Sequence, residues 1–353
     1  MKSFKIILTL FTLVAMLTSC EHKVAMNTVV YKDGSLDKTI TIEGDSANID
    51  ENFMGVVPDK GWHVTILNKD STKKSDQEKL ILQFSKHFKN SEEANSDLGN
   101  PNDTLFRVTS RFDKKLKWFY TYVRYSDTYH AINRLQEPIS DYFTFEDFAF
   151  INRLPAEGSS ISKADSLYLD RLNDKIFDVY GSHALFEEYY QRLEELLKSE
   201  NEIAWLDTLK NHKEKLFESL QSDKQIEDLA GLLKKAGISN LPLQDQEFIR
   251  LQQEMESITN FISKASNGKY IHAITMPYRV IYSNADSIKG NTLYWKPSST
   301  KFLLKDYEMV GEARTLNNWA IVVSIGFILL SIVLMFYKRR PKTGNNLGNN
   351  VPN

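Results

Sequence analysis

The hydrophobic and polar positions of this chain follow different patterns in successive regions. From residue 28 to about residue 126, apolar and polar residues alternate in short runs, which is typical of half-buried β-strands. From about residue 139 to 266, apolar residues recur every three or four positions, which predicts helices. Alternating runs return between residues 270 and 310, and a continuous apolar stretch follows from Trp319 to Tyr337.

The alternating runs predict strands near both ends of the helical region. The clearest prediction is a hairpin around Asp33 and Gly34, because a glycine tolerates the positive φ of a tight turn. Asp113 to Lys115 is predicted to join two later strands. The predicted strands are Thr28 to Tyr31, Lys38 to Glu43, Trp62 to Leu67, Leu80 to Lys86, Leu105 to Phe112, Leu116 to Ser126, Tyr270 to Thr275, Arg279 to Tyr282, Thr292 to Trp295 and Leu303 to Val310.

The helical region predicts four helices, and a short separate helix, capped by Ser91, is expected from Ser91 to Leu98. The first of the four begins at a capping box on Ser162, and the second at another on Ser199. The third ends at Gly237 and the fourth at Gly268, since glycine commonly follows a helix C-terminus.

The stretch from Trp319 to Tyr337 predicts a transmembrane helix, because about nineteen uncharged residues at 1.5 Å per residue span a hydrocarbon core. Trp319 is expected at the outer boundary, where an indole favours the interface. The tail that follows begins with basic residues, which places it in the cytoplasm. These residues are Lys338, Arg339, Arg340 and Lys342.

The N-terminus has the layout of an export signal. Lys2 and Lys5 precede an apolar run from Ile6 to Leu17, which is too short to span a membrane. The run ends in Leu17-Thr18-Ser19-Cys20, which is similar to a bacterial lipobox, so Cys20 is the predicted lipidation site. The alternative is ordinary cleavage without acylation. Cys20 is the only cysteine, which excludes an internal disulfide.

Together these signals predict one crossing of the inner membrane, with the bulk of the chain outside the cytoplasm. Cys20 and Trp319 are both expected at the membrane surface, so the two ends of the ectodomain should lie close together. We therefore expect the strands between Thr28 and Glu43 to share a sheet with strands between Tyr270 and Val310.

The predicted fold class is α+β: a β-rich domain built from N- and C-terminal strands, with a large helical insertion and one C-terminal transmembrane helix. The insertion is large enough to form its own small domain and should be separable. The predicted division is 1–19 signal peptide, 20–136 β-rich ectodomain, 137–267 helical insertion, 268–313 second β-rich part, 319–337 transmembrane helix and 338–353 cytoplasmic tail.

Composition and motifs nominate no catalytic residue, metal site or cofactor. The chain has 44 basic and 46 acidic residues, so it offers no basic field for nucleic acid. Its 7 histidines are scattered, without the spacing of a helical zinc site. It has no nucleophile elbow, phosphate-binding loop or dinucleotide-binding turn.

Aromatic residues supply the candidate ligand-binding positions. Trp118, Tyr120 and Tyr122 are expected on one face of a strand whose other face is also apolar. That face needs a cover, which could be the helical block, a cavity with an apolar ligand, or a partner. A second cluster between Tyr142 and Phe150 predicts either a buried connector or a segment on lipid.

Short motifs near both ends of the ectodomain resemble LppM-type lipoproteins. The residues that carry the resemblance are Asp33-Gly34-Ser35, Met276-Pro277, Ser283-Asn284-Ala285, Gly290-Asn291-Thr292 and Trp295. Tyr278 stands where the family pattern has glycine, and the helical block is additional. The resemblance implies a β-rich extracytoplasmic domain with an apolar cavity, linked to lipid or glycolipid binding.

Two functions are therefore carried forward. The first is a non-enzymatic lipoprotein that binds a lipid or another hydrophobic ligand, with membrane lipids as partners. The alternative is an envelope scaffold whose helical insertion holds a protein partner.

Overall fold

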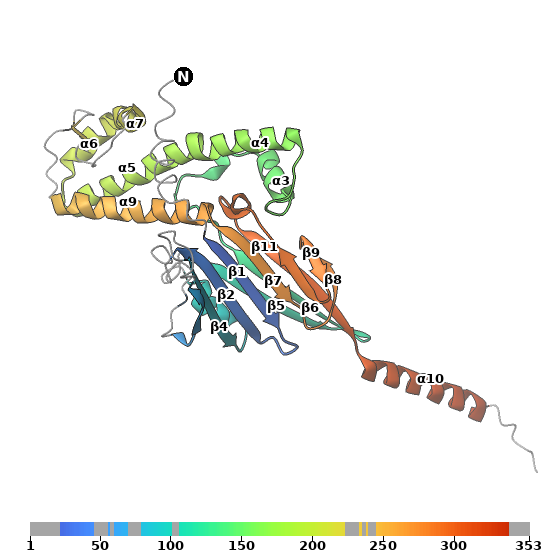
Figure 1. The fold of residues 1–353 in the computed structure, drawn as a ribbon. Coiled ribbons are helices and arrows are strands. Elements are labelled where there is room, and N and C mark those ends of the chain that lie inside the picture. Colours follow the sequence, from blue (N-terminus) through green and yellow to red (C-terminus); the bar gives the residue numbers. More distant parts are fainter. Residues whose placement is uncertain are drawn as a thin grey trace, which may run out of the picture.

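The structure is a computed structural model that describes residues 22–45, 56, 60–69, 79–100, 106–222, 233–234, 238 and 245–338. The predicted signal peptide, Cys20 and nearly all of the basic tail lie outside the described residues. The fold is α+β, as predicted from the sequence, with two sheets, a helical block and one long apolar helix at the C-terminal end (Figure 1).

The larger sheet has seven strands in the order β3-β4-β2-β1-β7-β10-β9. The smaller sheet has four strands in the order β5-β6-β11-β8. The strands are β1 Lys23–Val30, β2 Leu36–Asp45, β3 His63–Lys69, β4 Lys79–Phe88, β5 Val108–Leu116, β6 Tyr120–Tyr129, β7 Lys269–Thr275, β8 Arg279–Ser283, β9 Ser287–Lys289, β10 Thr292–Trp295 and β11 Tyr307–Leu316.

Strand β1 joins the two ends of the chain within the larger sheet. It pairs antiparallel with β2 and parallel with β7, with Val24 opposite Tyr270. The predicted pairing of the first hairpin with C-terminal strands is therefore confirmed. Gly34 takes a φ of 98° in the β1–β2 turn, as the Asp-Gly signal predicts.

The hairpin of β5 and β6 differs from its prediction. The chain turns at residues 117–119, and the predicted turn, Asp113 to Lys115, lies within β5. Its charged residues lie on an outward, solvent-exposed part of the strand, where Asp113 pairs with Arg111. Polar residues on an exposed strand resemble a turn in sequence, which explains the error. Strand β11 also begins later than predicted, because Ser299–Phe302 form a 3-10 turn, η5.

Some of the helices begin at a capping side chain and others do not. The described helices are α2 Ser91–Leu98, η3 Ile139–Asp141, α3 Phe145–Arg153, α4 Lys163–Asp174, the π-helix η4 Lys175–Gly181, α5 Ser182–Ser199, α6 Ala204–Asn211, α7 Lys213–Ser222, α9 Asp245–Ser266 and α10 Asn318–Lys338.

Some predicted caps differ. The Ser162 side chain caps α4 as predicted, accepting from the Asp165 N–H. Ser199 does not begin a helix, because it is the last residue of α5 and its hydroxyl donates to the Leu196 carbonyl. Asn90, not Ser91, caps α2. Most of the predicted third helix, up to Gly237, lies outside the described residues.

Two hydrophobic clusters hold the ectodomain together. The first fills the space between the sheets and continues into α3, α4, η4 and the end of α9, through residues such as Phe150, Ile176 and Phe261. The second lies farther out, among α5, α6, α7 and α9, and includes Leu197 and Leu209. The near part of the helical block thus shares the core of the β-rich part, so this core does not stop at residue 137.

The helical block covers one end of the two sheets, and α10 leaves from the opposite end (Figure 1). The first described residue, His22, lies at the helical end, where its carbonyl accepts from the Lys269 N–H at 2.9 Å. The next residue along β7, Tyr270, contacts Tyr129, which pairs with Tyr307 at the start of β11.

The expectation that the two ends of the ectodomain lie together is therefore wrong. From Tyr307, β11 runs away from His22 to Leu316, about 30 Å at roughly 3.3 Å per residue. The pairing of β1 with β7 brings strands together, but β1 begins at one end of the sandwich and β11 finishes at the other.

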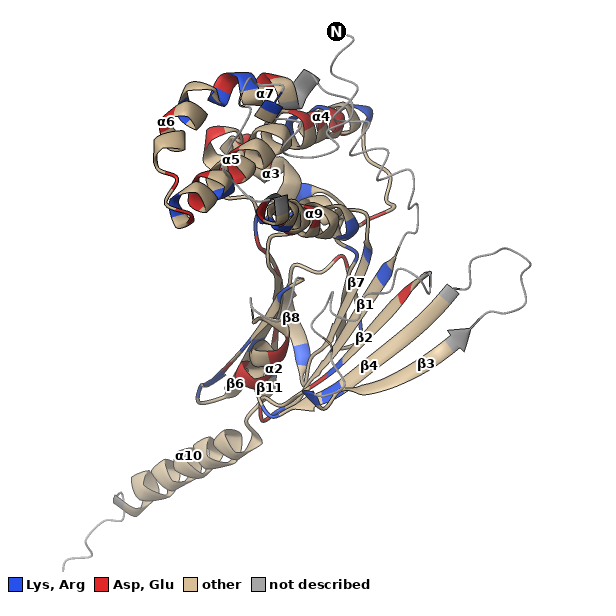
Figure 2. Ribbon diagram, turned by 90° about the vertical axis from the view of Figure 1, so that its left-hand side faces the viewer, with Lys and Arg blue, Asp and Glu red and all other residues tan. Residues whose placement is uncertain are grey.

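Helix α10 is long and apolar enough to span a membrane, and 6% of its most apolar window is buried. Charged residues gather on the helical block and the turns, whereas α10 carries none before Lys338 (Figure 2).

Candidate functional site

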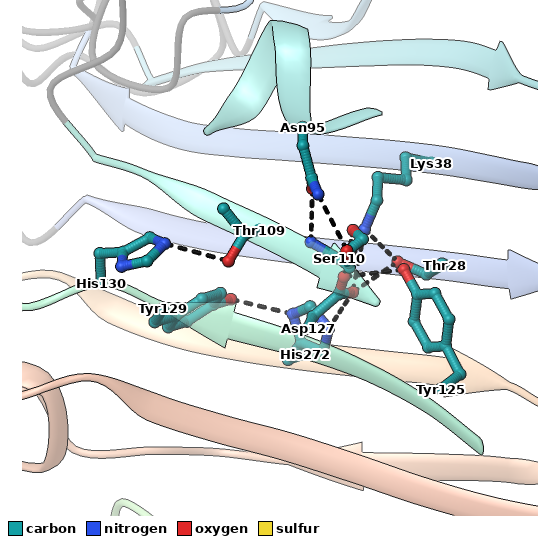
Figure 3. Close-up of polar contacts among 10 residues, drawn as sticks. All are labelled: Thr28, Lys38, Asn95, Thr109, Ser110, Tyr125, Asp127, Tyr129, His130 and His272. Atoms are coloured by element: carbon teal, nitrogen blue, oxygen red, sulfur yellow. Dashed lines mark hydrogen bonds and ion pairs between the residues drawn. The ribbon is translucent and has the colours of Figure 1, made fainter. Parts of the chain in front are cut away.

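A buried polar cluster lies between the two sheets, centred on Asp127 of β6 (Figure 3). Lys38 Nζ lies 2.8 Å from Asp127 Oδ1 and 2.9 Å from Oδ2. Asp127 Oδ1 also accepts from Ser110 Oγ at 2.6 Å and from the Tyr125 hydroxyl at 2.7 Å, while Oδ2 accepts from Thr28 Oγ1 at 3.1 Å. Strands from both sheets thus donate to one carboxylate.

His272 of β7 extends this cluster. Its Nε2 lies 2.9 Å from Asp127 Oδ2, and its Nδ1 lies 3.0 Å from the Tyr129 hydroxyl. An ionised carboxylate only accepts, so Nε2 carries the proton and Nδ1 accepts from Tyr129. Burial lowers the pKa of His272, and the hydrogen bond and charge of Asp127 oppose that shift without cancelling it. His272 is therefore neutral at neutral pH.

The charge state of Asp127 follows from its partners. Burial raises the pKa of a carboxyl group, but the charge of Lys38 and the hydrogen bond from His272 outweigh it. Together they hold the pKa of Asp127 well below its usual range. Burial and the nearby carboxylate also raise the pKa of Tyr125, which stays a donor.

Lysine, aspartate, histidine and tyrosine together resemble a catalytic set, but this cluster offers no access. Lys38, Asp127 and His272 are each 0% exposed. None of them lines the apolar pocket described below. The cluster instead joins the two sheets, and each donor is satisfied by an acceptor in the other sheet or nearby.

Sequence analysis missed this cluster, although a signal for it exists. Lys38 occupies an inward position of β2 between the buried residues Leu36 and Ile40. His272 and Asp127 interrupt similar buried alternations in β7 and β6. A charged residue in the inward register of a strand requires a buried partner.

An apolar pocket of about 60 Å³ lies where the helical block meets the β-rich part. This volume holds several water-sized spheres, or a short piece of a hydrocarbon chain. Its walls come from the segments that follow β6 and η5, from η4 and α5, and from α9. The lining residues are Asn133, Leu135, Ile176, Phe177, Tyr180, Gly181, Ser182, Leu185, Thr259, Ile262, Leu303 and Leu304.

The π-helix η4 forms one wall of the pocket. Four of its residues line the pocket, and the Tyr180 hydroxyl accepts from Asn133 Nδ2 at 2.7 Å and donates to the Glu137 carbonyl at 3.0 Å. A side chain at Gly181 would place its Cβ 3.0 Å from the Ile176 carbonyl oxygen. π-helical turns are rare and frequently occur at functional sites, so η4 adds weight to this pocket.

The polar side chains that line the pocket already have partners. Ser182 Oγ donates to the Asp178 carbonyl, and Thr259 Oγ1 donates to the Met255 carbonyl at 2.9 Å. Asn133 is held by Tyr180 as described above. Because these groups bond to the protein, the pocket offers an incoming molecule mainly apolar surface.

The sequence candidates Trp118, Tyr120 and Tyr122 lie elsewhere. Trp118 belongs to the β5–β6 turn, and its Nε1 donates to Ser324 Oγ of α10 at 2.9 Å. Tyr120 and Tyr122 are half-buried on the outer face of β6. Their role in ligand binding stays a prediction, and the structure does not bring them to the apolar pocket.

Other side chains, not the helical block, cover this face of β6. The Arg314 guanidinium lies 4.7 Å from the Tyr120 ring centre, and Lys117 Nζ lies 5.0 Å from that of Tyr122. In the other aromatic cluster, Phe143 and Phe150 are buried, so this segment is largely a buried connector. Phe145 is the exception, at 86% exposed.

No group of three or more histidine, cysteine, aspartate or glutamate side chains among the described residues is arranged to hold a metal ion. Cys20 lies outside those residues, so its lipidation stays a prediction.

Comparison with known proteins finds weak, fold-level similarity. No family model matches the chain, and no curated protein matches it. Among solved structures, the chain is similar to the NMR structure of the Mycobacterium tuberculosis LppM protein folded domain. The likeness covers 84% of this chain and 91% of that one, at 8% identity and a TM-score of 0.27.

Proposed function

We propose that this chain is a non-enzymatic, membrane-anchored lipoprotein that binds a lipid or another hydrophobic ligand in the apolar pocket beside η4. The observation that carries the proposal is the pocket itself, with apolar walls contributed by both parts of the ectodomain. Burial of apolar surface is the main source of affinity in such a site, at about 25 cal/mol per Å².

The polar cluster around Asp127 supports a non-enzymatic role. It contains the strongest concentration of ionisable side chains in the described core, yet all its charged members are fully buried and paired. Acid–base chemistry needs a group within reach of a substrate, and these groups have no such access.

The proposed location follows from the two sequence signals and from α10. Residues 1–19 would direct export, Cys20 would be acylated, and α10 would cross the inner membrane with residues 338–353 in the cytoplasm. The apolar, mostly exposed surface of α10 supports the anchor, and the Lys and Arg residues after it support the orientation.

The alternative is a scaffold that uses the helical block to hold an envelope protein. One observation favours it: the outer part of the block has its own hydrophobic cluster, separate from that of the sheets. A unit with its own core can project from the β-rich part and present a surface to a partner.

A pair of substitutions on α9 tests the pocket. Thr259 lines the pocket, whereas its neighbour Asn260 is exposed and does not. Phenylalanine at position 259 should occupy the space and reduce binding of a fluorescent fatty acid to the full-length protein in detergent by about tenfold, which corresponds to about 1.4 kcal/mol. Asn260→Phe is the matched control and should bind as the wild type does.

A native mass spectrum of protein purified from membranes separates the two functions. Lipid retained by the wild type and by Asn260→Phe, but lost from Thr259→Phe, supports ligand binding in the pocket. Equal retention by all three proteins, or a co-purified protein in place of lipid, contradicts it.

A further inference from the structure

The β5–β6 turn lies beside the start of α10 and exposes large apolar side chains. Leu116, Trp118 and Phe119 on the hairpin, with Leu316 and Trp319 next to it, are between 46% and 68% exposed. Strand pairing holds these residues together, because Leu116 pairs with Thr121 and Leu316 pairs with Tyr120. An exposed apolar patch of this kind marks an interaction surface.

Asn317 fastens this turn to the helix. Its backbone N–H donates to the Phe119 carbonyl at 2.9 Å, and its Nδ2 donates to the Lys117 carbonyl at 2.7 Å. Its Oδ1 accepts from Thr121 Oγ1 at 2.7 Å. Asn317 is buried, so these bonds are shielded from water. The turn and the first residues of α10 therefore form one rigid unit.

Trp118 reaches along α10 past its first turn. Its ring centre lies 5.4 Å from that of Trp319, and its Nε1 bonds to Ser324. Ser324 is five residues beyond Trp319, which is roughly 7.5 Å along a helix that rises 1.5 Å per residue. The polar interface of a bilayer is about 5 to 8 Å thick on each side. Because Trp319 marks the outer boundary of the hydrocarbon core, Trp118 lies at that boundary, with its indole N–H reaching just below it.

The charges around the turn suit a phospholipid surface. Lys115 and Lys117 are exposed on either side of Leu116, while the nearby Asp113 is paired with Arg111 at 2.8 Å. Aromatic side chains below a rim of basic residues are typical of segments that insert among lipid headgroups. Lysine side chains close to the bilayer surface are attracted to anionic headgroups.

We propose that the β5–β6 turn is a second membrane contact, inserted among the phospholipid headgroups of the bilayer that holds α10. This rests on the proposed role of α10 as the membrane anchor. Since Asn317 and Trp118 fix the turn to α10, and α10 points away from the sandwich in both views, the ectodomain stands upright (Figures 1 and 2). The helical block, with the apolar pocket, is then the part farthest from the bilayer.

The test places a fluorescent label at single cysteines of the full-length chain in a Cys20→Ser background. The labelled positions are Phe119→Cys at the turn, Ile332→Cys within α10 and Phe145→Cys on the helical block, with Leu116→Cys as a second turn position. Each protein is reconstituted in phosphatidylcholine and phosphatidylglycerol vesicles that also contain two spin-labelled phospholipids, one that quenches near the headgroups and one that quenches within the acyl chains. We expect loss of emission at positions 116, 119 and 332, and none at 145.

Labels in the turn, in α10 and in the helical block distinguish a failure of the inserted turn from a failure of the α10 anchor. Quenching at 332 without quenching at 116 or 119 overturns the inserted turn and leaves the anchor intact. No quenching at 332 overturns the anchor, and the inference with it. Quenching at 145 means that the sandwich lies along the membrane, which overturns the upright arrangement.

Discussion

The two ends of the β-sandwich are fastened in different ways. At the α10 end, a clasp of hydrogen bonds around Asn317 and one Trp–Trp contact join the sheet to the helix. At the other end, a continuous hydrophobic core runs from the sheets into α3, η4 and α9. A few local hydrogen bonds can open without the rest of the fold, whereas a shared hydrophobic core unfolds as one unit. The helical block, which the sequence pattern separates most clearly from the strands, is therefore the part joined most firmly to the sheets.

The two ends of the sandwich also separate the two predicted membrane attachments, Cys20 and α10, which sequence analysis placed at one membrane surface. His22 lies at the helical end, and Cys20 is two residues before it. Two residues span at most about 7 Å, whereas β11 covers about 30 Å between the level of His22 and α10. In the upright arrangement, the described start of the chain at His22 and the bilayer of α10 lie at opposite ends of the sandwich. Acyl chains of Cys20 found in that bilayer would require the sandwich to lie down.

The largest expected effect comes from removing the helical block. Deleting residues 139–266 takes away Phe150, Ile176, Phe261 and other members of the shared core. Buried aromatic and aliphatic truncations cost about 2 to 5 kcal/mol each, and the whole domain has only about 5 to 15 kcal/mol. We expect the product to lack a cooperative thermal transition by circular dichroism.

A smaller deletion provides the control for this prediction. Removing residues 194–252 takes most of the outer cluster, and a short Gly/Ser linker can close the gap because Arg192 Nη1 lies 2.8 Å from Glu254 Oε2. This product should still melt cooperatively. A strand-rich product of the larger deletion that melts cooperatively would show that the two ends of the sandwich are not joined as described.

The next largest effect tests the joint between the sheets. Lys38→Met leaves the Asp127 carboxylate buried without its counter-charge, which should cost about 3 to 5 kcal/mol. Lys32→Met, at an exposed turn residue, is the control and should change stability by less than about 0.5 kcal/mol. Guanidinium unfolding measures both. A cost of less than about 1 kcal/mol for Lys38→Met would show that the ion pair does not hold the sheets together.

Sequence analysis predicted the fold wherever the signal was local. The bounds of β10 and α2 match their predictions, and the Asp33-Gly34 turn has the expected geometry. The β5–β6 turn was misplaced, because exposed charged strand residues resemble a turn. The π-helix η4 depends on a slipped hydrogen-bond pattern that leaves no mark on a 3.6-residue period.

The candidate sites were harder to predict, for a physical reason. Asn133, Tyr180, Thr259 and Leu304 meet in the apolar pocket but come from four separate segments. No local pattern specifies that meeting, which depends on how the block docks on the sheets. Trp118 was noticed for its ring, but its neighbour Ser324 is 206 residues away in the chain. Lys38 can be recognised in the sequence as a charged residue at an inward strand position. Its partners cannot, because they come from distant strands.

The smallest expected effect is a pH dependence of stability that acts at the helical end of the sandwich and not at the α10 end. Burial, with the charge of Lys264 adding to it, lowers the pKa of His22 from 6.5 to about 4. The folded pKa lies below the unfolded one, so His22 favours the folded state fully above pH 6.5, and this contribution is lost as the pH falls towards 4. The shift corresponds to roughly 3 kcal/mol. His272, whose pKa is also lowered, acts in the same direction.

Unfolding curves between pH 7 and 4 for His22→Gln should therefore be flatter than those of the wild type, while His63→Gln, at an exposed position on β3, should match the wild type. Amide exchange then locates the effect. The Lys269 N–H, which donates to the His22 carbonyl, should exchange faster as the pH falls, after correction for the intrinsic rate. The Asn317 N–H, bonded to the Phe119 carbonyl in the clasp, should not. Equal acceleration at both amides would mean that acid loosens the sandwich as a whole, and that its two ends do not open independently.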